Sequence, residues 1–370
     1  MKISRFIRDS AGVCAAVLVV HLGGGAAVSR VQNPQSEAEL RLAYAGAPET
    51  WPRPILHDGA VFTEFGPLPT VVHPADNPTS REKVTLGRRL FDDPKLSRSG
   101  QIACASCHLQ EIEFAESIRT SFGHDRQRGR RNSQPLTVVA WMNPLFWDGR
   151  ASDLEAQSLH PLVDPLEMAA EDLPWVVQKV AEDPTYAAAF KAAFGDEAVT
   201  LDRIAKSLAS FQRALRPRNS RFERFVGGNQ RALSDQEIRG LHLFRTKAGC
   251  ANCHNGPLLS DGQFHNLGLH FYGRQREDLG RHEVTGDPAD AGKFRTPSLR
   301  GVNRTAPYMH NGLFPHLEGT INFYNAGAAH PRPVEGRTYD LPFPKTDPLL
   351  EPLNLSAQER ADLKAFLEAL

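Results

Sequence analysis

The sequence has little cysteine, no net charge and no strand-like alternation of apolar and polar residues. Five of its 370 residues are cysteine, and 43 basic residues balance 43 acidic ones. A formal charge of zero gives no indication that the protein binds nucleic acid or attracts an acidic partner strongly. Because period-two alternation is missing, we expect a mainly α-helical fold, and the length favours about two domains.

Four of the five cysteines fall in two copies of Cys-x-x-Cys-His. The copies are Cys104-Ala-Ser-Cys107-His108 and Cys250-Ala-Asn-Cys253-His254. This is the attachment signature of c-type haem, in which two thiols bind the porphyrin and the histidine binds the iron. The alternatives are two disulfides or one zinc site. Zinc ribbons separate their cysteine pairs by only about 15–20 residues, and disulfides leave both histidines unexplained. The sequence therefore predicts two haems.

The first 29 residues are typical of a secretory signal peptide. A basic start precedes a short apolar stretch at 13–22, and Ala27-Val28-Ser29 is a small-residue cleavage site. The stretch is too short to span a bilayer, although an uncleaved anchor is the alternative. Cys14 lacks a lipobox, so we interpret it as an apolar residue that is removed. Since c-type haem is attached outside the cytoplasm, we expect a location in a bacterial periplasm.

Capping boxes predict three helices, two of which precede a haem motif. They begin at Thr79 with Glu82, at Ser234 with Glu237 and at Ser356 with Glu359. The shared order of helix, loop and haem motif indicates a duplicated unit, and two unrelated amphipathic helices are the alternative. Apolar residues at helical spacing predict further helices over 173–181, 186–194 and 201–215.

We expect two cytochrome-c-like domains with one haem each. The N-terminal haem domain is placed at 79–230 and the C-terminal one at 231–370. Residues 30–78 are rich in proline and have few periodic apolar residues. We interpret them as an extended segment that wraps over the fold, with a disordered linker as the alternative.

A series of short segments accompanies the two haem motifs over residues 80–370. They are Leu86–Phe91, Arg131-Asn132, Phe146–Arg150, Asp164–Met168, Phe264–Gly268, Phe294–Arg300 and Pro307–Gly312. Any one of them is weak, but their order and spacing are specific. The sequence resembles the bacterial di-haem cytochrome c peroxidase family, and within it the MauG-like branch.

The resemblance assigns roles to individual residues. It implies that His108 is the proximal ligand of a peroxide-reacting haem and His254 that of an electron-transfer haem. Trp147 would relay electrons between the haems. Gln157, Pro161 and Glu167 correspond to distal-pocket residues, with Glu167 the acid/base group. Without the resemblance, Trp147 would equally fit a core aromatic residue and Glu167 a surface carboxylate.

Two further metal assignments follow from the resemblance. Asn132, Thr305 and Pro307 correspond to positions that hold a calcium ion between the domains, and hard oxygen ligands suit calcium. Fourteen residues after His310 stands Tyr324. Methionine-type peroxidases have a methionine ligand of the second haem there, and MauG-like proteins a tyrosine. The alternative is that Met309 is the ligand and Tyr324 packs in the core.

The sequence departs from the MauG pattern at two positions. His124 stands where methionine-type peroxidases carry a histidine that closes the first haem before activation, and MauG lacks it. It is either a displaceable haem ligand or an ordinary loop histidine. Ala248 stands where MauG has a surface tryptophan that draws electrons from its protein substrate. This alanine weakens the case for the same protein-oxidising role.

The resemblance implies an enzyme that reduces hydrogen peroxide to water. A small reduced cytochrome c or cupredoxin would supply the electrons, and the enzyme would be a monomer or homodimer. One alternative is a MauG-like oxidase whose partner is a protein substrate with residues to modify. The other is a non-enzymatic di-haem electron carrier, which would require His124 to be a permanent ligand.

Overall fold

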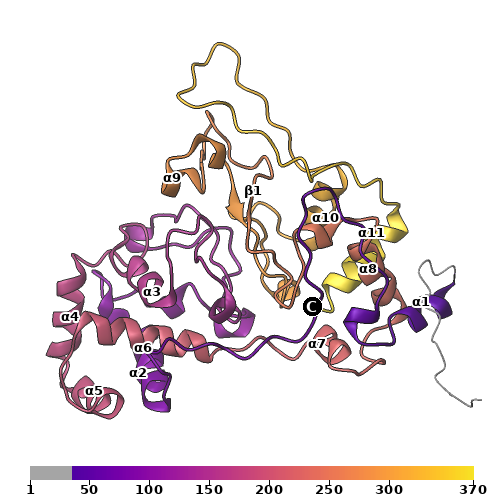
Figure 1. Cartoon of the computed structure of the whole chain (residues 1–370). Coiled ribbons are helices and arrows are strands. Elements are labelled where there is room, and N and C mark those ends of the chain that lie inside the picture. The colour runs from indigo at the N-terminus through magenta and orange to yellow at the C-terminus, as the bar shows by residue number, and fades with distance from the viewer. Residues whose placement is uncertain (1–35) are drawn as a thin grey trace, which may run out of the picture. The chain divides into compact units, whose positions relative to one another are not determined.

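The structure is a computed structural model that describes residues 36–370, so the predicted signal peptide at 1–29 lies outside the described residues. The described part is mainly helical, as predicted (Figure 1). The helices are α1 (Glu37–Ala43), α2 (Arg81–Phe91), α3 (Leu154–Val163), α4 (Leu173–Glu182), α5 (Ala187–Phe194), α6 (Leu201–Ala214), α7 (Arg221–Val226), α8 (Asp235–Arg245), α9 (His282–Thr285), α10 (Leu317–Asn325) and α11 (Ala357–Leu367). Within residues 36–370 the strands are β1 (Phe264–His265) and β2 (Phe294–Arg295), which pair antiparallel.

Local sequence signals account for the starts of most helices. Ser234 and Ser356 form capping boxes for α8 and α11, as predicted. Helices α4, α5 and α6 occupy the three ranges that apolar spacing predicts. Pro174 lies in the first turn of α4, where its missing N–H costs nothing. Gly195 ends α5 with a left-handed φ of 93°, which a residue without Cβ adopts readily.

The predicted cap of α2 is wrong by one residue. Ser80 is the N-cap, and its hydroxyl accepts a hydrogen bond from the Lys83 N–H at 3.2 Å. The Thr79 hydroxyl instead lies 2.8 Å from Nδ1 of His73. From the sequence alone, Thr79 and Ser80 are equally suitable N-caps. The contact of Thr79 with His73 leaves Ser80 as the cap.

Buried side chains form two hydrophobic cores, one among α2, α3, α4 and α6 and the other among α7, α8, α10 and α11. A glycine permits close helix packing in each. A Cβ on Gly87 of α2 would lie 1.9 Å from the Ser207 carbonyl of α6, and one on Gly240 of α8 would lie 2.0 Å from the Asp362 carbonyl of α11. This shared contact supports the predicted duplication. The described residues fall in one compact unit, and the domain boundary at 230 stays a prediction.

The segment before α2 passes from the second core to the first (Figure 1). Trp51 and Phe65 are buried in the second core, and the Asn77 side chain donates to the Lys206 carbonyl of α6. The prediction of an extended segment is wrong at residues 37–43, because a capping box of Ser36 starts α1 there. Between Trp51 and α2 the chain has no regular element.

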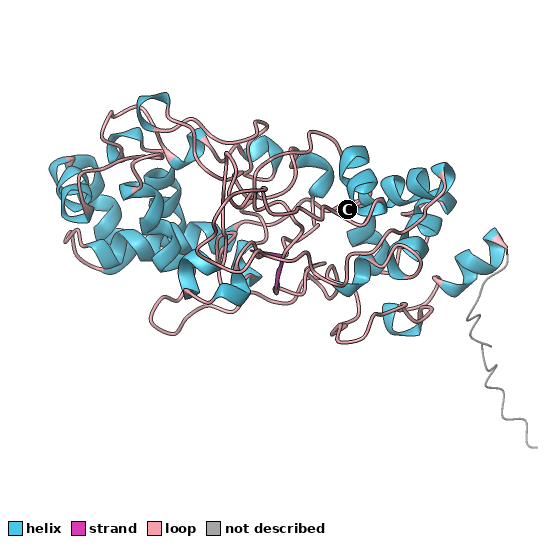
Figure 2. Ribbon diagram, turned by 90° about the horizontal axis from the view of Figure 1, so that it is seen from above, coloured by secondary structure: helices cyan, strands magenta, loops and turns pink. Residues whose placement is uncertain are grey.

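Loops fill the region between the two helical groups (Figure 2). In residues 36–370, none of the helices has both the length and the apolar character that crossing a bilayer requires.

Candidate active site

Each Cys-x-x-Cys-His motif lines a pocket of its own. The first pocket, of about 370 Å³, contains Cys104, Cys107 and His108. The second, of about 360 Å³, contains Cys250, Cys253 and His254. The four thiols are free, so the pairs form no disulfides. Because the pairs line separate pockets, the arrangement also does not suit one shared zinc site.

Both motif histidines are oriented to bind a metal through Nε2. Nδ1 of His108 lies 2.7 Å from the Phe114 carbonyl, and Nδ1 of His254 lies 2.9 Å from the Leu259 carbonyl. A carbonyl only accepts, so each Nδ1 carries the proton and each Nε2 keeps its lone pair. Burial lowers the pKa of both imidazoles, which favours the neutral, metal-binding form. Free thiols beside such histidines fit covalently attached haem.

The predicted distal residues Gln157, Pro161 and Glu167 all line the first pocket with His108. Gln157 and Pro161 are four residues apart on α3 and therefore share a face. A turn then carries Glu167 into the pocket wall, with the Asp164 carbonyl accepting the Glu167 N–H at 3.0 Å. The three residues therefore belong to the wall of the same pocket as His108.

The Glu167 side chain is partly buried and has no basic partner in hydrogen-bonding contact among the described residues. Burial, reinforced by the Asp164 carboxylate and opposed by Arg150, raises the pKa of Glu167 to about 7. At neutral pH both its acid and its carboxylate forms are therefore populated. A carboxyl group in that state can accept a proton and return it, which is what a general acid–base catalyst requires.

The predicted tyrosine ligand lies in the second pocket. Helix α10 presents Leu317, Thr320, Ile321 and Tyr324 to that pocket, at the spacing of one helical face. Burial raises the pKa of Tyr324, so its hydroxyl stays neutral unless a cation stabilises the phenolate. Met309 lines the same pocket, so both predicted alternatives for the ligand remain within it.

Trp147 belongs to the walls of both pockets. Its indole Nε1 donates to the Asn132 carbonyl at 2.9 Å, and its own carbonyl accepts the Arg295 N–H at 2.8 Å. The ring is buried and packs edge-to-face against His310. Asn132 and Arg295 also line both pockets. The structure therefore places a fixed, oxidisable side chain between the two motifs.

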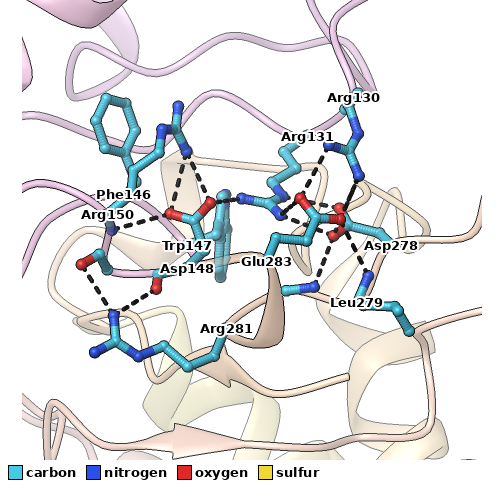
Figure 3. A network of polar contacts seen from close by, with 12 residues as sticks. Arg130, Arg131, Phe146, Trp147, Asp148, Arg150, Asp278, Leu279, Arg281 and Glu283 are labelled. Atoms are coloured by element: carbon cyan, nitrogen blue, oxygen red, sulfur yellow. Dashed lines mark hydrogen bonds and ion pairs between the residues drawn. The ribbon is translucent and has the colours of Figure 1, made fainter. Parts of the chain in front are cut away.

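An ion-pair network anchors the backbone beside Trp147 (Figure 3). Asp148 pairs with Arg131 and, at 3.1 Å, with Arg150. Arg131 also pairs with Asp278 through two 2.8 Å contacts. Although burial opposes it, hydrogen bonding to Asp278 raises the pKa of Arg131, so the guanidinium stays charged. Sequence reasoning singled out the Arg131-Asn132 segment but gave Arg131 no role.

The three predicted calcium residues all belong to the wall of the second pocket. Asn132, Thr305 and Pro307 all line it. Nδ2 of Asn132 lies 3.4 and 3.3 Å from the carbonyls of Ile118 and Arg119, so Oδ1 is the atom left to face a cation. An amide side-chain oxygen is a hard donor of the kind that calcium prefers.

Of the two positions that depart from the MauG pattern, His124 lies outside the pocket of its haem motif and Ala248 lines one. His124 does not line the first pocket: its Nε2 lies 3.6 Å from Asp125, and its N–H bonds the Glu167 carbonyl at 2.8 Å. Nδ1 of His124 is buried and has no hydrogen-bond partner among the described residues, so both predicted alternatives for His124 remain. Ala248 is 3 % exposed and lines the second pocket, where Ile55 and His57 of the N-terminal segment also lie.

Comparison with known proteins gives consistent matches. The family model for di-haem cytochrome c peroxidase matches residues 81–231. The cytochrome-c peroxidase IdrP1 of Pseudomonas sp. (strain SCT) is 38% identical over 336 residues, which cover 83% of this chain and 85% of that protein. The methylamine utilization protein MauG of Methylorubrum extorquens is 36% identical, covering 84% of each. A solved MauG-like protein associated with microbial copper homeostasis superposes with a TM-score of 0.73 at 34% identity, covering 82% of this chain and 94% of that one.

Proposed function

Because the chain belongs to the di-haem cytochrome c peroxidase family, we infer that it reduces hydrogen peroxide to water with electrons from a small redox protein. The observation that carries this function is the partly buried Glu167, which shares a pocket with His108 and whose pKa desolvation raises to about 7. A passive electron carrier has no use for such a group. The predicted signal peptide supports a location in a bacterial periplasm.

The family implies two c-type haems, and each would supply an iron that exchanges single electrons. Cys104, Cys107 and His108 would hold the first haem, and Cys250, Cys253 and His254 the second. Reduction of one hydrogen peroxide consumes two electrons and two protons and yields two waters. The protein must therefore move protons at one pocket and electrons between two.

Glu167 is the group we assign to proton transfer. In its carboxylate form it accepts the proton from one oxygen of hydrogen peroxide, and in its acid form it returns that proton to the other oxygen as the O–O bond breaks. The amide of Gln157 can hold peroxide by a hydrogen bond while this happens. Trp147 then serves as the electron path between the pockets, since it lines both. Asn132, Thr305 and Pro307 would bind calcium.

Replacement of Tyr324 by Met is expected to raise the reduction potential of the second haem. A phenolate is a hard anionic donor that stabilises ferric iron, whereas a thioether favours the ferrous state. Potentiometric titration of both haems measures the effect. Tyr308→Phe is the matched control, because Tyr308 lines the same pocket but its hydroxyl donates to the Val302 carbonyl at 3.0 Å. An unchanged potential in Tyr324→Met would show that Tyr324 is not a ligand.

A protein-modifying oxidase is the second candidate function, favoured by the 36% identity to MauG and by Tyr324. The buried Ala248 argues against it, since this position offers no exposed aromatic side chain to a protein substrate. A peroxidase oxidises a soluble electron donor rapidly, whereas a protein oxidase oxidises it slowly.

Steady-state turnover of the holoprotein with hydrogen peroxide and a reduced small cytochrome c or cupredoxin tests the peroxidase function. We expect rapid oxidation of two donor molecules per peroxide consumed. Slow donor oxidation beside a long-lived oxidised enzyme would support the protein oxidase instead. Sedimentation analysis of the same sample decides between monomer and homodimer.

A further inference from the structure

A third cavity, of about 530 Å³, lies apart from both haem motifs and is rich in arginine. Its wall contains Arg119, Arg128, Arg130 and Arg276, from two stretches of chain far apart in sequence. None of the peroxide chemistry assigned above uses these side chains. The cavity adjoins both haem pockets, because Arg130 also lines the first and His310 also lines the second.

The two carboxylates in the cavity wall are already engaged. Asp278 accepts both 2.8 Å contacts from Arg131, which lies outside this cavity. Glu277 accepts the Gly273 N–H at 2.6 Å. Arg130 pairs with Glu283, another residue outside the cavity, at 3.0 and 2.7 Å. Arg130 and Arg131 therefore pair with Glu283 and Asp278, and the wall keeps one further carboxylate, Glu277, beside three further arginines.

Arg119, Arg128 and Arg276 have no carboxylate within ion-pair distance among residues 36–370. Arg119 Nε donates to the Asn311 carbonyl at 2.8 Å, and one Arg128 nitrogen donates to the Thr120 carbonyl at 3.0 Å. Burial, together with the nearby Arg276 and Arg128, lowers the pKa of Arg119. Three like charges facing one cavity repel one another unless an anion enters between them.

A buried donor in the same wall also lacks a partner. Asn311 is 9% exposed, and its Oδ1 accepts the Leu313 N–H at 3.1 Å. Its Nδ2 is buried and makes no hydrogen bond within the described part of the chain. Leaving such a donor unsatisfied costs about 1–3 kcal/mol, which an acceptor in the cavity would recover.

We propose that this cavity binds an oxyanion, held by Arg119, Arg128 and Arg276 with Nδ2 of Asn311 as the neutral donor. Guanidinium groups recognise carboxylate and phosphate oxygens through paired, charge-assisted hydrogen bonds. Two sources share this chemistry: a free inorganic oxyanion such as phosphate, or a propionate carboxylate of a haem in the adjoining pockets. The site goes beyond the peroxidase function and does not depend on it.

Titration of the holoprotein with inorganic phosphate, followed by calorimetry at low ionic strength, tests the site. Two variants remove its features: Arg276→Gln removes an exposed charge, and Asn311→Asp keeps the Oδ1 acceptor while replacing the donor by an acceptor. Arg126→Gln is the matched control, because Arg126 is an exposed arginine two residues before Arg128 and does not line the cavity. Haem absorbance and circular dichroism establish that each variant is folded.

Saturable phosphate binding that weakens about tenfold or more in both variants, but not in Arg126→Gln, would support a free-anion site. A propionate in the cavity would be supported by a different result. The parent protein would then not bind phosphate, and the haem reduction potential would be lower in both variants but not in Arg126→Gln. The potential falls because losing a positive charge or gaining a negative one stabilises ferric iron. If phosphate does not bind and neither variant changes a potential, the proposal is wrong.

Discussion

Replacing Glu167 by Gln is expected to slow the reaction with hydrogen peroxide by about two to four orders of magnitude, the usual contribution of a positioned acid–base group. Glutamine keeps the size of the side chain and its place in the wall of the first pocket. It can neither take the proton from one peroxide oxygen nor deliver it to the other. Stopped-flow measurement of the second-order rate constant for peroxide gives the effect directly.

The control for this substitution is Glu171→Gln, an exposed glutamate four residues further on and outside the pocket. It is expected to react at the parent rate. The pH profile gives an independent check. Because the carboxylate is the proton acceptor, the parent rate should rise as pH increases through about 7 and level off above it. Glu167→Gln should lack this inflection, and a parent-like rate in that variant would exclude the proton-transfer role.

Replacing Trp147 by Phe is expected to slow the spread of oxidation to the second haem by at least about tenfold, a change that needs only about 1.4 kcal/mol of activation free energy. Phenylalanine is harder to oxidise than tryptophan, and it lacks the indole N–H that holds the ring to the Asn132 carbonyl. Both haems should remain attached, since the haem motifs are untouched. Stopped-flow spectra after addition of peroxide resolve the two haems.

Trp141→Phe provides the matched control for Trp147. The indole of Trp141 also donates to a carbonyl, that of Pro69 at 2.8 Å, but Trp141 lines neither haem pocket. Its replacement removes the same kind of hydrogen bond without interrupting the path between the pockets. Equal rates of second-haem oxidation in the parent protein and Trp147→Phe would rule out Trp147 as the relay.

Local signals in the sequence predict local structure well. Ser234 and Ser356 start their helices as predicted, and the paired thiols with adjacent histidines line separate pockets. Where two neighbouring residues are chemically equivalent, as Thr79 and Ser80 are, the choice depends on a third residue. The capping box at Ser36 carries the same signal, but the surrounding prolines favoured an extended segment.

Long-range pairings leave no such signal. Arg131 and Asp278 meet across 147 positions, and the arginine-rich cavity combines residues near 119–130 with others near 276 and 311. The net charge of zero does not indicate which arginines form ion pairs and which do not. The spacing of His124 from the first motif indicates a haem ligand as readily as a loop residue, and this prediction stays untested.

The roles of Trp147, Glu167 and Tyr324 depended on resemblance to a family, because each residue alone fits an ordinary packing or surface role. The structure adds the position and surroundings of each side chain, which the residue type alone does not give. Trp147 lines both pockets, burial shifts the pKa of Glu167, and one face of α10 carries Tyr324 into the second pocket.

Mixing the diferric holoprotein with one equivalent of hydrogen peroxide, and following both haem spectra by stopped flow, tests the joint action of the two pockets most directly. The spectra of both haems are expected to change in one kinetic phase, before any donor is added, because Trp147 lets the pockets share two oxidising equivalents. A change confined to one haem, with the other still ferric until donor arrives, would contradict a shared two-haem site.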